Sequence, residues 1–116
     1  MGILVTGSFK TTDGVPYTQA YCRIQSYIVE CNDAPNHGLG ISYRMTYYIT
    51  QEAKLSGSPP FTGPPIECNR GFQTTLAESI SYPGGIFAMV YADYQKFLTD
   101  SGYTFTQVLE SGQTPV

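Results

Sequence analysis

The chain has 116 residues, of which 41% are hydrophobic and only 13% are charged, and its formal net charge is −3. This length fits a single domain that can bury a core without a metal or a disulfide. The few basic residues form no cluster, which argues against nucleic acid as a partner. No apolar run approaches the roughly 20 residues of a membrane helix, so no membrane partner is expected either.

The first half of the chain predicts three long strands, at residues 3–10, 16–31 and 39–54. Residues 39–54 show the clearest alternation of apolar and polar side chains, which is typical of a strand with one face on a core. Together with residues 16–31 they predict a long antiparallel hairpin around the loop at 32–38. In the second strand, one face is expected to carry Ala20, Cys22, Ile24 and Ile28, and the other Tyr17, Tyr21, Arg23, Tyr27 and Val29.

The middle of the chain contains four prolines within residues 55–65, and proline cannot donate to a sheet ladder. We therefore predict a loop there, followed by a further strand at residues 66–80. Apolar residues then recur at spacings of three and four, which predicts an amphipathic helix over residues 86–100. Gly102 suits the left-handed position that ends a helix, and residues 103–109 are expected to pack back on the sheet.

The order of these elements predicts a single domain that spans residues 1–116 and determines the fold class we expect for it. It is α+β and mainly β: a small antiparallel β-sandwich, or a β-sheet with a long hairpin, and one C-terminal helix packed on a sheet face. The start of the chain has no signal-peptide pattern, so synthesis in a cytoplasm is expected.

The sequence offers little for catalysis, so the chain is predicted not to be an enzyme. His37 is the only histidine and lies in a loop rich in Asn, Pro and Gly. The carboxylates are scattered singly, and no phosphate-binding or calcium-binding motif is present. Cys22, Cys31 and Cys68 have no metal-ligand spacing, so neither a metal nor a cofactor is predicted. A small hydrolase remains a remote alternative.

Low charge and ten tyrosines favour a surface that is covered by partners, because tyrosine is enriched at interfaces. The hairpin and the proline-rich loop are the predicted contact elements. Packing within the sheet is a second interpretation of the tyrosines. A sugar-binding platform is a third, and packing is the stronger of these two. An odd cysteine count argues against a disulfide framework, although a cysteine near an interface could cross-link copies in an oxidising medium. The predicted contact residues are Tyr17, Tyr21, Tyr27, Tyr43, Tyr47, Tyr48, Pro59, Pro60 and Phe61.

Four stretches resemble small structural proteins encoded among the tail genes of bacteriophages. They are VTGSFKTTDGV at residues 5–15 with AYCRI at 20–24, YYITQEAK at 47–54, and the helix YADYQKFL at 91–98. The resemblance implies a virion protein, assembled in the host cytoplasm in several copies in the tail, baseplate or neck. Its partners would be copies of itself and other virion proteins. A capsid decoration protein and a carbohydrate-binding module for host adhesion are the alternatives.

Overall fold

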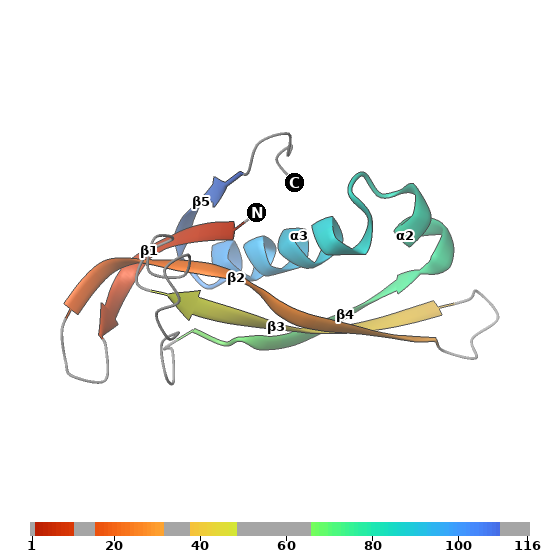
Figure 1. Ribbon diagram of the computed structural model, residues 1–116, viewed down its shortest axis with the longest axis horizontal. Coiled ribbons are helices and arrows are strands. Elements are labelled where there is room, and N and C mark those ends of the chain that lie inside the picture. The colour runs from red at the N-terminus through yellow and green to blue at the C-terminus, as the bar shows by residue number, and fades with distance from the viewer. Residues whose placement is uncertain (1, 11–15, 32–37, 49–65, 110–116) are drawn as a thin grey trace.

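The computed structural model describes residues 2–10, 16–31, 38–48 and 66–109, and five of its strands form one antiparallel sheet (Figure 1). The sheet has the order β4-β3-β2-β1-β5. Two helices follow β4, namely α2 (Leu76–Ser81) and α3 (Gly85–Asp100). The strands are β1 (Gly2–Lys10), β2 (Pro16–Cys31), β3 (Gly38–Tyr48), β4 (Asn69–Thr75) and β5 (Thr104–Val108).

The predicted fold class is confirmed, with a single curved sheet in place of the sandwich alternative. The long hairpin is formed by β2 and β3, which pair from Tyr21 opposite Tyr48 to Cys31 opposite Leu39. Alternation along β3 is also confirmed, because every second side chain from Leu39 to Tyr47 is buried. Residues 49–54 of the predicted strand and the predicted loop at 55–65 lie outside the described residues.

The strand predicted at residues 66–80 is wrong in its second half, where the chain forms helix α2. The Thr75 side chain accepts a hydrogen bond from the Glu78 amide, so Thr75 caps the helix N-terminus. The Glu78 carboxylate accepts a further bond from the Thr74 hydroxyl at 2.9 Å. A threonine followed three residues later by a glutamate is a recognised helix-start pattern, and here it outweighs the apolar content of the segment.

Helix α3 agrees closely with the helix predicted over residues 86–100, and its end is the predicted one. Gly102 has a φ of 86°, which a residue with a side chain rarely adopts. The amides of Gly102 and Tyr103 donate to the carbonyls of Thr99 and Leu98, an arrangement that ends a helix in this way. The chain then turns back, and β5 pairs with β1 as predicted for the residues after the helix.

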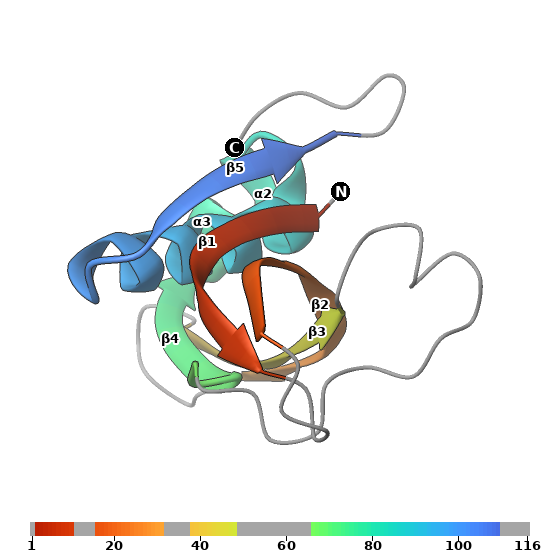
Figure 2. The same cartoon turned by 90° about the vertical axis from the view of Figure 1, so that its left-hand side faces the viewer.

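The core lies between α3 and the inner face of the sheet, which we define as the face that α3 covers. Figure 2 shows the sheet curving around α3. Val90, Tyr91, Tyr94 and Leu98 of the helix are fully buried against side chains of the first three strands. The Tyr47 and Tyr94 hydroxyls form a hydrogen bond within this core, and Tyr94 also donates to the Glu67 carbonyl at 2.9 Å. Tyrosines therefore hold helix and sheet together through both packing and polar contacts.

Candidate assembly interface

The six predicted contact residues that the structure describes fall into three groups by exposure. Tyr21, Tyr43 and Tyr47 are buried, with exposed fractions of 4% or less. Tyr17 and Tyr48 are half-buried, and Tyr27 is 41% exposed. The remaining three predicted residues, Pro59, Pro60 and Phe61, lie outside the described residues. Of these six tyrosines, Tyr27 is therefore the most exposed.

The three buried tyrosines pack within the domain, as the alternative of sheet packing describes, so their rings are not available to a partner of the folded chain. Tyr43 and Tyr47 point to the inner face because they alternate with polar residues along β3. Tyr21 occupies the space where a side chain at position 2 would lie, so Gly2 permits its burial. Tyr43 and Tyr47 therefore lie inside the core and offer no ring face for stacking on a sugar.

A different surface results from the unequal lengths of β1 and β2. Strand β1 has 9 residues and β2 has 16, and their pairing ends where Ile3 lies opposite Cys22. Beyond that point β2 pairs with β3 on one side, and no other described strand pairs with it. Figure 1 shows this part of the hairpin extending past the N-terminal end of β1. We call residues 16–24 the proximal segment of β2 and residues 25–31 the distal segment.

A β-bulge at Gln25 separates the two segments. The register with β3 shifts between Ile24, opposite Met45, and Ser26, opposite Arg44. A bulge adds one residue to one strand, so every later side chain changes face. Tyr27 and Val29 consequently share the inner face with Tyr43 and Ile41, their partners in β3, whereas Ile28 lies on the outer face.

This arrangement corrects the predicted faces of the second strand. Ile28 was expected on the same face as Cys22 and Ile24, and Tyr27 and Val29 on the opposite face. The expectation assumed unbroken alternation over sixteen residues, which the extra residue at the bulge interrupts.

All residues of the distal segment are exposed, on both faces of the sheet. Three of them are large and apolar: Tyr27 is 41% exposed, Ile28 62% and Val29 38%. The distal segment contains no proline and no lysine, and Glu30 is its only charged residue. Natural sheets usually protect an open edge with such residues, because unpaired backbone groups otherwise recruit another strand. The distal segment thus has the features of a site for strand addition.

The boundary between the segments is closed by the helix. The amide of Ile24 donates to the Tyr91 hydroxyl at 3.1 Å, so this amide is already used. Tyr91 belongs to α3 and is fully buried. The edge available to another strand therefore begins at Gln25.

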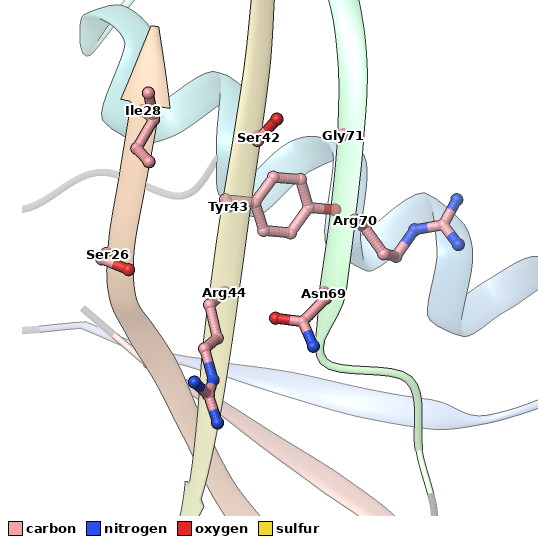
Figure 3. Close-up of a pocket in the computed structure, with 8 residues that line it drawn as sticks. All are labelled: Ser26, Ile28, Ser42, Tyr43, Arg44, Asn69, Arg70 and Gly71. Atoms are coloured by element: carbon pink, nitrogen blue, oxygen red, sulfur yellow. The ribbon is translucent and has the colours of Figure 1, made fainter.

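The outer face of the hairpin has an open hollow of about 530 Å³ beside the distal segment (Figure 3). Ser26 and Ser42 have small side chains and Gly71 has none, so the described residues leave space at the middle of this face. Arg44 contributes a positive charge, while the side chain of Arg70 points away in Figure 3, and its guanidinium lies 4.1 Å from the centre of the Phe97 ring. Tyr43 is the aromatic residue of this lining and is only 4% exposed, so the hollow has no stacking surface for a sugar.

The titratable groups of the core are arranged for stability. Burial raises the pKa of the Cys22 thiol and of the Tyr47 and Tyr94 hydroxyls well above their usual values. Burial also raises the pKa of Tyr91, to about 12. The Tyr43 hydroxyl donates to the Asp93 carboxylate at 2.5 Å. These groups stay protonated at neutral pH, so the Tyr43 and Tyr94 hydroxyls can donate to Asp93 and to the Glu67 carbonyl.

The three cysteines lie in different surroundings. Cys22 is buried, Cys68 is partly exposed and Cys31 is exposed at the end of β2. All three are free thiols. Among the described residues, no three His, Cys, Asp or Glu side chains lie close enough together to hold a metal ion. Neither described helix is long and apolar enough to span a membrane.

Sequence reasoning placed the contact surface on the hairpin but missed the open edge. Two signals could have indicated it. A first strand of about eight residues is too short to cover a second strand of sixteen, and no charge occurs between Arg23 and Glu30. The bulge at Gln25 had no signal in the residue pattern.

Comparisons with protein-family models, curated proteins and solved structures gave no significant match to this chain.

Proposed function

We propose that this chain is a bacteriophage virion structural protein that assembles in several copies in the tail, baseplate or neck. The observation that carries the proposal is the exposed distal segment of β2, where apolar side chains lie on both faces of an open sheet edge. An edge of this kind suits addition of a strand from another chain. Other virion proteins and copies of the chain itself are the partners we propose.

Composition and sequence resemblance support the same function. Charged residues make up only 13% of the chain, and a surface poor in charge is typical of a protein that is covered by neighbours. The resemblance to tail-gene products at residues 5–15, 20–24, 47–54 and 91–98 supplies the virion setting. The tyrosines and thiols of the core contribute stability rather than chemistry, so we propose an assembly role without catalysis.

Mass spectrometry of virus particles tests this function. Particles from a culture that carries the gene would be purified through two successive density gradients after nuclease treatment. We expect the chain to remain with the particles in a constant ratio to the major capsid protein through both gradients. Loss of the chain between the gradients would contradict a structural role.

Immunogold labelling of the same particles locates the chain. Label on the tail, baseplate or neck supports the proposal. Label distributed over the shell would contradict that placement and indicate a capsid decoration protein instead. The neighbouring genes provide an independent check, because a portal or tape-measure gene beside this one would support a virion protein.

A further inference from the structure

We propose that two copies of the chain pair antiparallel through the distal segments of their β2 strands, which joins their sheets into one. The inference rests on the proposed function for its biological setting, since it names a second copy as the first partner of the open edge. Its test uses purified protein alone, so the two proposals can fail separately.

The length of the open edge selects one register. When identical strands pair antiparallel around a two-fold axis, one residue lies opposite itself and its neighbours pair symmetrically. The distal segment runs from Gln25 to Cys31, and the amide before it is already bonded to Tyr91. The register that uses the whole segment therefore has its axis at Ile28.

This register places apolar side chains together on both faces. On the inner face, Tyr27 of each copy lies opposite Val29 of the other, and aromatic with β-branched residues are favourable cross-strand pairs. On the outer face, the two Ile28 side chains meet at the axis. These are the large apolar side chains of the distal segment, and each is more than a third exposed in the single chain.

The same register also makes the charges complementary. Glu30 of the second copy lies opposite Ser26, and Ser26 lies opposite Arg44 of β3 on its other side. Strands are about 4.8 Å apart, so the Cα atoms of that glutamate and of Arg44 would be about 10 Å apart. Both side chains are exposed, and they can meet above the small side chain of Ser26 (Figure 3). Because of the two-fold symmetry this contact occurs twice, so Glu30 of one copy faces Arg44 of the other at each end of the paired strands.

A single pair of seven-residue strands buries less surface than the roughly 1,600 Å² of a standard interface. We therefore expect a weak dimer, with a dissociation constant on the order of 100 µM. Weak contacts of this size suit an assembly in which each copy makes several contacts at once.

Sedimentation equilibrium across a concentration series tests the pairing. Wild type is expected to shift from monomer to dimer as its concentration rises from about 10 µM to 1 mM. Ile28→Lys places two like charges opposite each other at the axis, and we expect it to weaken association at least about tenfold. The matched control is Ile80→Lys, because Ile80 is 76% exposed and belongs to α2. A wild type that stays monomeric, or equal effects of the two substitutions, would overturn the proposal.

Disulfide cross-linking tests the register and does not depend on a disruptive substitution. In a Cys31→Ser background, Ile28→Cys is expected to give a covalent dimer on mild oxidation, since directly opposite residues are 4.5–5.5 Å apart at Cα, a range that suits a disulfide. Ser26→Cys is the control, because the two copies of residue 26 would be separated by about 13 Å along the strands. Failure of Ile28→Cys to cross-link, or equal cross-linking of the two variants, would overturn this register.

The outcomes separate the two proposals. A chain that dimerises through Ile28 but leaves the particles during purification keeps the pairing and contradicts the virion function. A chain that stays with the particles but is monomeric at 1 mM contradicts the pairing, and another virion protein would then be the partner of the open edge.

Discussion

The two segments of strand β2 both contain tyrosine, isoleucine and cysteine, but their surroundings differ completely. In the proximal segment, Tyr21 and Cys22 are buried beneath neighbours, with β1 paired along the strand. In the distal segment, Tyr27 and Cys31 are exposed, and β3 is the one described strand that pairs there. Burial in this sheet is therefore decided by the length of the neighbouring strand and the reach of the helix, more than by residue type.

The largest expected difference between the segments is in thiol reactivity. Cys31 is exposed, whereas Cys22 is buried and reacts only when the structure opens. We expect Cys31 to react with a thiol-specific reagent at least about a thousandfold faster than Cys22. Peptide mapping of the labelled Ile28→Lys variant measures both rates, and that variant avoids any protection of Cys31 by a second copy. Similar rates would show that the proximal segment is not protected.

The next largest difference is expected between alanine substitutions of Tyr47, which lies in β3 opposite the proximal segment, and of Tyr27 in the distal segment. Tyr47→Ala removes a ring that packs opposite Cys22 in the core, and we expect it to lower the free energy of unfolding by about 3–5 kcal/mol. Tyr27→Ala removes an exposed ring, with an expected loss below about 1 kcal/mol. Urea denaturation followed by circular dichroism gives both values. A loss of several kcal/mol for Tyr27→Ala would mean that the distal segment is packed in the single chain.

High pH should destabilise the protein through the proximal segment. The folded-state pKa of Cys22 is raised above its ordinary value of 9.0, so the stability linked to this thiol is fully present below pH 9 and is lost as pH rises above it. At pH 10 the expected loss from this thiol is about 1.4 kcal/mol. Urea titrations at pH 7 to 10 measure the total loss. Cys22→Ala should reduce the total loss by about 1.4 kcal/mol and leave the part due to the buried tyrosines, whose pKa values are also raised, whereas Cys31→Ser should leave the loss unchanged. The reverse pattern would contradict the assignment to Cys22.

The smallest expected effect concerns the boundary between the segments. Tyr91→Phe removes the hydroxyl that accepts the Ile24 amide, and we expect a loss of about 1 kcal/mol in the free energy of unfolding. Hydrogen exchange resolved by NMR should show faster exchange at the Ile24 amide. The control is the amide of Val5, which lies in β1 opposite Ala20 of the proximal segment. Unchanged exchange at Ile24 would show that the helix does not close the edge.

The parts of this fold that follow local patterns could be predicted from the sequence. Alternation along residues 41–49 indicated which side of β3 is buried, and the spacing of apolar residues indicated α3 together with its end at Gly102. Tyrosine burial was also foreseeable as sheet packing. In each case the signal and the structure involve residues that are close in sequence.

The parts that depend on the relation between elements could not be predicted in the same way. The bulge at Gln25 depends on the register with β3, and residue types alone do not specify a register. The open edge depends on where β1 stops relative to β2, which is decided by how the sheet assembles around α3. Helix α2 had a local signal in Thr75 and Glu78, but the apolar side chains at Leu76 and Ile80 favoured the wrong interpretation.

The position of α3 on one face of the sheet has a consequence for any wall built from this protein. A two-fold axis perpendicular to a sheet leaves its faces unexchanged, so a pair joined through β2 would carry both helices on the same side. Among the described residues, the opposite side would carry no helix, only the sheet with the hollow and Arg44 of each copy. Such a pair has a thick side covered by the helices and a thinner sheet side with the two Ile28 side chains at its centre. A layer made from it would present different chemistry to the interior of a particle and to the medium.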